Sequence, residues 1–303
     1  MLAETDRRSA LSRGGATIRA VEGPCVNRSV VDVEGVDVPV FDEGRVSLRC
    51  DVPRQRFLFE SGHGPKALYD RRQHSVALSA GSCDQESAAV RHFWQAAVLP
   101  RLWSEEDRLV LHAAVVGMDD SRLLLVGPSG RGKSTLATAL SCSGWTIWGD
   151  DVCACAEDAA LTAVVRGLRL LPDAYDTLLA DHPAEVIGPG ELKLMLDGSP
   201  ADVDVADPLG PISAILVLGE AETKVSLRAL APGAACMALV ENSFCLDPTD
   251  RLAAGRRLTY AAAIAAQVPV LSLHYPRRYD AIPHVDGVIR SIFDERDNGK
   301  RAG

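Results

Sequence analysis

The alternation of apolar and polar residues divides the chain into a β-rich first part and a mixed second part. Between residues 28 and 80, short alternating runs are separated by Gly, Pro and Asp, as in successive β-hairpins. Near residue 82 the spacing changes to that of a helix, which Pro100 should end or kink. Between residues 107 and 151 a strand, a glycine-rich loop, a helix and another strand follow one another, and this order predicts an α/β fold.

The later segments continue this alternation, so we predict one α/β domain over residues 86–296. A β-rich accessory region with a mobile N-terminal tail should precede it over residues 1–85. A short charged tail over residues 297–303 should be disordered. Further strands are expected at 161–171, 211–219 and 268–275, and further helices at 173–182, 251–267 and 280–295.

Composition narrows the range of partners. The chain has 32 Lys and Arg against 41 Asp and Glu, and its formal net charge of -9 argues against nucleic acid or a membrane surface as the main partner. No apolar run reaches the roughly 18 residues that span a bilayer, and the N-terminus has no apolar core of signal-peptide length. We therefore expect a cytoplasmic protein, in which the eight scattered cysteines are structural.

A glycine-rich loop is the clearest sign of chemistry. The segment GPSGRGKS at 127–134 matches the phosphate-loop pattern G-x-x-x-x-G-K-S between an apolar strand and a helix-forming segment. Glycines let consecutive backbone N–H groups turn toward phosphate oxygens, and the helix adds its positive N-terminal end. Lys133 can reach the β- and γ-phosphates of ATP, and the Ser134 hydroxyl can bind Mg²⁺. The predicted nucleotide contacts are Gly127, Pro128, Ser129, Gly130, Arg131, Gly132, Lys133, Ser134 and Thr135.

Two adjacent carboxylates, Asp150 and Asp151, end the strand that follows the helix of the loop. An Asp-Asp turn after a strand is common on protein surfaces, but here the strand should bring both side chains to the mouth of the loop. One carboxylate can then hold Mg²⁺, and the other can accept the proton of an attacking hydroxyl. His112 stands in the apolar strand before the loop, where a histidine is more often a core residue than part of a site.

Together these motifs resemble the catalytic core of the HPr kinase/phosphorylase family. The matching segments are LHAAVV at 111–116, GPSGRGKSTLATAL at 127–140 and GWTIWGDD at 144–151. They are most similar to smaller HPr-kinase-related proteins, some of which belong to peptide-natural-product gene clusters. The resemblance implies a P-loop, HPr-kinase-like core that uses ATP and Mg²⁺ to phosphorylate a seryl hydroxyl on a peptide or protein, with peptide tailoring as one setting.

The resemblance also implies roles for individual residues. Asp150 is the expected base, assisted by Lys133, and Asp151 is the expected carboxylate beside the metal, together with Ser134. His112 should hydrogen-bond near Asp150. Weaker candidates for contacts with substrate or phosphate are Arg169 and Lys193. Members of the family form homo-oligomers, although this sequence marks no interface.

Two departures separate the chain from the bifunctional enzymes of that family. Thr135 stands where those enzymes have Glu, and their second, glycine-rich signature segment has no counterpart downstream. Phosphorylase activity and HPr itself as acceptor are therefore left open. Two alternatives to a peptide kinase also stay open: a kinase of a small-molecule hydroxyl, and a nucleotide-sensing regulatory protein that binds ATP without transfer. The intact carboxylate pair argues against the second, because binding alone needs no base.

Overall fold

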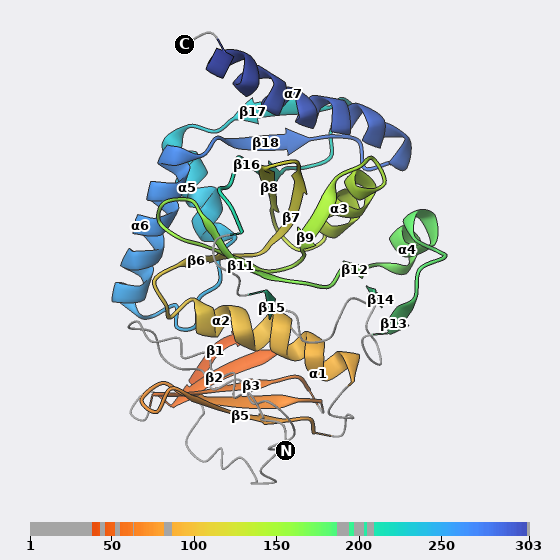
Figure 1. Cartoon of the computed structure of the whole chain (residues 1–303). Coiled ribbons are helices and arrows are strands. Elements are labelled where there is room, and N and C mark those ends of the chain that lie inside the picture. Colours follow the sequence, from red (N-terminus) through yellow and green to blue (C-terminus); the bar gives the residue numbers. More distant parts are fainter. Residues whose placement is uncertain are drawn as a thin grey trace, which may run out of the picture. The chain divides into compact units, whose positions relative to one another are not determined.

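The computed structural model describes residues 38–42, 46–51, 55–62, 64–81, 87–186, 194–196, 203–204 and 209–301 (Figure 1). The chain divides into two compact units between Gln85 and Glu86. The first unit contains an antiparallel sheet, and the second contains a mixed sheet with helices, so the predicted α/β class and the β-rich N-terminal part are confirmed. No helix within the described ranges is both long and apolar enough to cross a bilayer.

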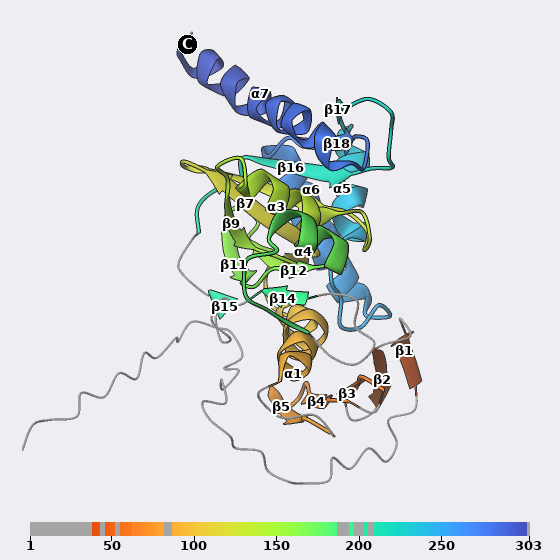
Figure 2. The same ribbon diagram turned by 90° about the vertical axis from the view of Figure 1, so that its right-hand side faces the viewer.

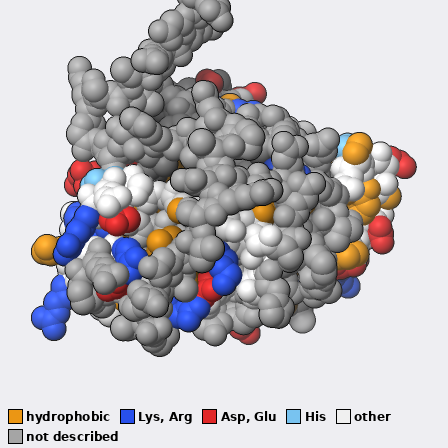
Figure 3. All heavy atoms as spheres, turned by 90° about the horizontal axis from the view of Figure 1, so that it is seen from below, with side chains coloured by type: hydrophobic (Ala, Val, Ile, Leu, Met, Phe, Trp, Pro, Cys, Tyr) orange, Lys and Arg blue, Asp and Glu red, His pale blue; other side chains and the backbone are white. Residues whose placement is uncertain are grey.

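The N-terminal unit is a five-stranded antiparallel meander with its strands in chain order. The strands are β1 (Val38–Asp42), β2 (Ser47–Asp51), β3 (Arg56–Glu60), β4 (Lys66–Asp70) and β5 (Ser75–Ser79). Ion pairs join Arg56 to Asp51 and Lys66 to Glu60 across neighbouring strands. On the face drawn in Figure 3, described Lys and Arg side chains likewise lie beside Asp and Glu.

A six-stranded mixed sheet forms the centre of the second unit, in the order β17-β18-β16-β8-β7-β9. Three strands, β8, β16 and β18, run parallel, whereas β7 and β17 run antiparallel to their neighbours. Continuous apolar runs such as LLLV and AILVL suit strands that are buried on both faces. The bounds are β7 (Ala113–Met118), β8 (Ser121–Val126), β9 (Thr146–Gly149), β16 (Ala214–Leu218), β17 (Ser226–Ala229) and β18 (Val270–His274).

Helices cover both faces of this sheet. Two helices, α3 (Lys133–Ser141) and α7 (Ile282–Arg301), pack on one face, with α7 at the top of Figure 2. On the other face, α5 (Pro232–Glu241) and α6 (Arg251–Gln267) lie side by side. The assigned helix α7 extends as far as Arg301, into the segment 297–303 that the sequence analysis expected to be a disordered tail.

Smaller elements complete the second unit. A four-stranded antiparallel sheet has the order β15-β11-β10-β6, and a three-stranded one has the order β12-β14-β13. Their bounds are β6 (Leu109–Leu111), β10 (Cys153–Cys155), β11 (Leu161–Val165), β12 (Arg169–Leu170), β13 (Ala184–Val186), β14 (Leu194–Leu196) and β15 (Val203–Asp204). Two short helices, α4 (Pro172–Leu178) and the 3-10 helix η2 (Tyr279–Ala281), lie beside the candidate site.

The predicted helix, which Pro100 was expected to end or kink, continues past this residue. It comprises α1 (Ala88–His92), the π-helical η1 (Phe93–Val98) and α2 (Leu99–Trp103). The backbone N–H of Leu99 donates to the carbonyl of Trp94, five residues back. A turn of this width gives the ring of Pro100 room beside the preceding carbonyls, which a regular α-helical turn would not.

Two chain segments pass together from the four-stranded sheet into the six-stranded sheet. The segment β6–β7 pairs with β9–β10, with Leu111 opposite Cys153 in one sheet and Val115 opposite Gly149 in the other. Both pairs fit one register, which places His112 opposite Val152, the residue after Asp151. Asp151 has a left-handed φ of +70°, and its Oδ1 lies 3.4 Å from His112 Nε2.

Gly149 allows the chain to approach β11 closely at this break. A Cβ atom at position 149 would lie 2.8 Å from the Cβ of Val164 and 2.8 Å from the carbonyl oxygen of Val165. The N–H of Asp150 donates to that carbonyl at 3.0 Å, and the N–H of Val165 donates to the carbonyl of Val152 at 2.9 Å. One residue of β11 therefore holds the turn at 150–151 from both ends.

A methyl group at position 149 should disturb this packing. We predict that Gly149→Ala lowers the free energy of unfolding in urea by about 1–3 kcal/mol, the usual effect of overfilling a packed site. The matched control is Gly255→Ala in α6, where the added methyl meets nothing within 4 Å. That change should raise the stability by up to about 1 kcal/mol, because alanine favours a helix interior. Equal stability of Gly149→Ala and the wild type would contradict the proposed constraint.

Candidate functional site

The glycine loop, residues 127–132, connects β8 to α3 at the carboxyl end of the parallel strands. Gly132 caps α3 with a φ of +83°, a left-handed conformation in which any side chain would be strained. Gly130 has a similar φ of +80°. The ring of N–H groups at the start of α3 is not used by hydrogen bonds within the helix, so it is suited to an anion.

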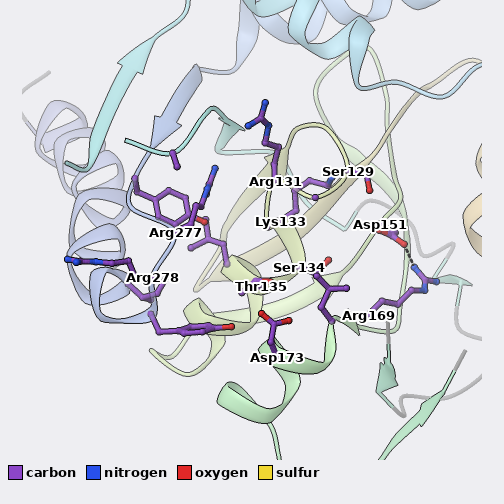
Figure 4. A pocket seen from close by; sticks show the side chains of 18 of the residues that line it. Ser129, Arg131, Lys133, Ser134, Thr135, Asp151, Arg169, Asp173, Arg277 and Arg278 are labelled. Carbon is purple, nitrogen blue, oxygen red and sulfur yellow. Dashed lines mark hydrogen bonds and ion pairs between the residues drawn. The ribbon is translucent and has the colours of Figure 1, made fainter. Parts of the chain in front are cut away.

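Lys133 lies buried at the base of this loop. Its Nζ donates to the carbonyl of Gly127 at 2.7 Å and to the carbonyl of Pro128 at 3.2 Å. The loop thus holds the ammonium group above its own backbone, at the centre of the site shown in Figure 4. A charge held in this way needs little movement to reach an oxyanion seated in the loop.

Asp150 is turned inward, toward α3. Its side chain is 0% exposed, and its Oδ1 accepts a hydrogen bond from Ser134 Oγ at 3.0 Å. Its Oδ2 accepts one from the backbone N–H of Arg169 at 3.2 Å. The Ser134 hydroxyl and the Asp150 carboxylate therefore offer two adjacent hard oxygens, which is the type of ligand that Mg²⁺ prefers.

Asp151 points the other way, into the pocket. It has a left-handed φ of +70°, and its residue remains 7% exposed. Its Oδ2 accepts a hydrogen bond from Arg169 Nη1 at 2.6 Å, and its Oδ1 lies 3.4 Å from His112 Nε2. The sequence analysis expected His112 to hydrogen-bond near Asp150. In the structure the imidazole lies beside Asp151, the neighbouring carboxylate, while Asp150 faces Ser134.

Arg169 carries a fully buried charge beside this carboxylate. Its Nη1 is bonded to Asp151, and its Nη2 donates to Oε1 of Gln95 at 2.9 Å. Gln95 itself is buried in the π-helical segment η1. The guanidinium, expected from sequence as a contact for substrate or phosphate, is thus already engaged in orienting Asp151.

Lys133, Ser134, Asp151 and Arg169 line one pocket of about 400 Å³. Its walls include His112, the glycine loop, Asp151, Arg169, Asp173 and the segment Tyr275–Tyr279 apart from Pro276. In Figure 4, Asp151 and Arg169 lie on one side of the loop, Arg277 and Arg278 on the other, and Asp173 near α4. Thr135 also lines the pocket, whereas Lys193 lies outside the described residues.

Several of these residues were missed by the sequence analysis. Gln95 is a polar residue within the apolar run FWQAAV, and a buried amide in such a run could have signalled a polar partner. Arg277 and Arg278 come one residue after the predicted strand at 268–275. Residues placed just after the carboxyl ends of parallel strands often form ligand sites, and this rule could have identified the pair.

No group of three or more His, Cys, Asp or Glu side chains in the described part of the chain is placed to hold a metal ion by itself. Magnesium in nucleotide sites is usually held by one or two protein groups, with substrate phosphates and water as its other ligands. The pair of Ser134 and Asp150 fits that kind of site.

Comparison with known proteins adds one similarity. No protein-family model matches the chain, and no curated protein matches it. Among solved structures, the chain is similar to the HPr(Ser) kinase/phosphatase from Coxiella burnetii, with 10% sequence identity. The similarity covers 64% of this chain and 95% of that chain, with a TM-score of 0.29. A superposition of this quality carries no inference about chemistry, so function has to be inferred from the residues of the pocket.

The buried pair of Arg169 and Asp151 gives a prediction about stability. Replacing Arg169 with Leu would leave the Asp151 carboxylate without its main partner, and breaking such a pair typically costs about 3–5 kcal/mol. Urea unfolding should show a loss of this size. The control is Arg278→Leu, because Arg278 and its partner Asp280 are both exposed and should contribute at most about 1 kcal/mol. Similar losses in both variants would show that Arg169 is not an essential counter-charge.

Proposed function

We propose that the chain is an ATP- and Mg²⁺-dependent kinase that transfers the γ-phosphoryl group to a serine hydroxyl of a peptide or protein. The observation that supports this most strongly is the meeting of three features in one pocket. These are the glycine loop with its buried Lys133, the Ser134 hydroxyl bonded to Asp150, and the Asp151 carboxylate bonded to His112 and Arg169.

The glycine loop is the proposed site for the triphosphate. Backbone N–H groups at the start of α3 can bind the phosphate oxygens, and the positive end of the helix favours their charge. Lys133 would exchange its carbonyl partners in the loop for oxygens of the β- and γ-phosphates. Since an anion is a better partner for an ammonium than a neutral carbonyl, this exchange favours binding.

Ser134 and Asp150 are the proposed holders of Mg²⁺. The ion, when bound, would neutralise part of the charge on the β- and γ-phosphates. The sequence prediction gave this role to Asp151, but two features favour Asp150. Its carboxylate is bonded to the Ser134 hydroxyl at the start of α3, and Asp151 rather than Asp150 lines the pocket that an acceptor would enter.

Asp151 is then the proposed base, a role that the sequence analysis gave to Asp150. Its carboxylate lines the pocket and is oriented by His112 and Arg169. As the acceptor oxygen bonds to the γ-phosphorus, the bond from that phosphorus to the β–γ bridging oxygen breaks, and ADP leaves. The hydroxyl proton passes to Asp151. Because the arginine stabilises the charged carboxylate, Asp151 should mainly orient the hydroxyl and accept the proton late in transfer.

The choice of acceptor rests on sequence motifs. The segments around His112, the loop and the Asp pair resemble those of the HPr kinase family, and this supports a seryl hydroxyl on a peptide or protein. The geometry of the pocket would serve a small-molecule hydroxyl equally well, because phosphoryl transfer depends on positioning and electrostatics. An acceptor screen with serine peptides beside small alcohols separates the two.

Nucleotide binding should depend on Lys133. We predict that Lys133→Ala raises the Kd for ATP with Mg²⁺ by about 10- to 100-fold, because one charge-assisted hydrogen bond contributes about 1.5–3 kcal/mol. Isothermal titration calorimetry measures this directly. Lys224→Ala removes an exposed lysine that does not line the pocket and should leave the Kd unchanged. Unchanged affinity in Lys133→Ala would exclude the loop as the phosphate site.

The two carboxylates should respond differently to loss of charge. Asp151→Asn keeps the shape and removes the base, so ATP should still bind while transfer falls by about 10²–10⁴-fold. Asp150→Asn removes a metal ligand and should instead raise the Mg²⁺ concentration needed for half-maximal transfer. The measurement is transfer of labelled phosphate to a serine peptide at varied Mg²⁺.

Three outcomes decide between the hypotheses. The opposite pattern would return the base to Asp150. Full transfer activity in both variants would exclude this mechanism. ATP binding by the wild type without transfer to any acceptor would favour the nucleotide-sensing alternative.

A further inference from the structure

One wall of the pocket has no role in the mechanism proposed above. It is formed by the segment that follows β18, Tyr275–Tyr279, which we call the 275–279 segment. Strand β8 leads into the glycine loop, and it has the Asp pair on one side and this segment on the other. On the first side lie β7 and then β9, which Asp150 follows; on the second lie β16 and then β18, which Tyr275 follows. Figure 4 shows Arg277 and Arg278 across the loop from Asp151.

The Arg277 guanidinium lies over the ring of Tyr275. Its guanidinium carbon lies 3.9 Å from the ring centroid of Tyr275, and its Nη2 donates to the carbonyl of Gly219 at 2.8 Å. Tyr275 is buried beneath it, whereas Arg277 is exposed to the pocket. A planar guanidinium fixed on an aromatic ring offers its other face for stacking against a further flat group.

The rest of the segment has matching chemistry. Tyr279 belongs to η2, is 37% exposed, and lines the same pocket together with Ile282. Burial raises the pKa of the Tyr275 hydroxyl above its ordinary value, so this group is neutral at pH 7. The hydroxyl also lies near the loop, since a Cβ on Gly132 would be 3.8 Å from it. The wall thus combines aromatic, planar cationic and apolar surface next to the loop.

The order of the phosphates indicates what this wall would contact. In a loop of this type the lysine reaches the β- and γ-phosphates, and the γ-phosphate must lie toward the carboxylate that activates the acceptor. The α-phosphate then lies toward the opposite side of β8, and the nucleoside leaves the loop there. We infer that the 275–279 segment binds the nucleoside end of ATP, with the purine ring stacked on Arg277 and Tyr279. This inference rests on the proposed nucleotide-binding function.

The test compares ATP with inorganic tripolyphosphate, which has the phosphates but no nucleoside. Calorimetry would measure both Kd values for the wild type, Tyr279→Ala and Arg277→Lys, the last of which keeps the charge but not the plane. Each variant should raise the Kd for ATP by about tenfold, within the range for losing one stacked base, and change the Kd for tripolyphosphate less than about twofold. Tyr279→Phe should bind ATP as the wild type does, because the ring is kept.

Arg228→Lys, on an exposed arginine of β17 that does not line the pocket, is the matched control and should change neither Kd. Equal weakening of both ligands by Tyr279→Ala, or no weakening of either, would overturn the inference. A rise in the KM for the acceptor with unchanged ATP affinity would also overturn it and assign this wall to the acceptor.

The kinase proposal can fail separately from this inference. A wild type that binds ATP more tightly than tripolyphosphate, and loses that preference in Tyr279→Ala, supports the nucleoside site even if it transfers no phosphate. Conversely, active transfer by a protein that binds both ligands equally would overturn the nucleoside site and retain the kinase.

Discussion

The pair of hydrogen bonds between Val165 and the turn at Asp150 and Asp151 is the constraint on which the candidate site depends. Val165 accepts from the N–H of Asp150 and donates to the carbonyl of Val152, so the turn cannot rotate. Gly149 permits the close approach that these bonds require. Because Asp151 then adopts a left-handed conformation, the two adjacent carboxylates face opposite sides, one toward Ser134 and the other toward the pocket.

A buried network of charged and polar side chains keeps the Asp151 carboxylate in this orientation. Arg169 pairs with Asp151 and is itself bonded to Gln95, so the guanidinium connects the π-helical segment η1 to the carboxylate. Buried ion pairs contribute little net stability, because desolvation offsets their attraction. We therefore attribute this network to orientation: an arginine that can bond both partners at once fixes where the Asp151 oxygens lie, and His112 adds a second restraint.

The pocket follows the edge where the parallel strands end. The turn after β9, the loop after β8 and the 275–279 segment after β18 lie along this edge in the order of the strands in the sheet. Parallel sheets commonly place ligand sites at this edge, since the chain leaves every such strand there. In the proposed function, a nucleoside triphosphate would extend along this edge. Its γ-phosphate would lie near the Asp151 carboxylate, its phosphates against the N–H groups of the glycine loop, and its nucleoside against the 275–279 segment.

The sequence by itself determined the features that depend on local geometry. A glycine loop can be predicted from residues 127–134 because glycine adopts the positive φ angles that turn N–H groups inward without steric cost. Likewise, the α/β class follows from residue spacing. Tertiary structure alone decided which carboxylate meets His112, because this depends on the pairing of β6–β7 with β9–β10 and on the left-handed turn at Asp151. It also decided that Arg169 is buried with Gln95 and that the 275–279 segment faces the loop, since these partners are far apart in the chain and only packing brings them together.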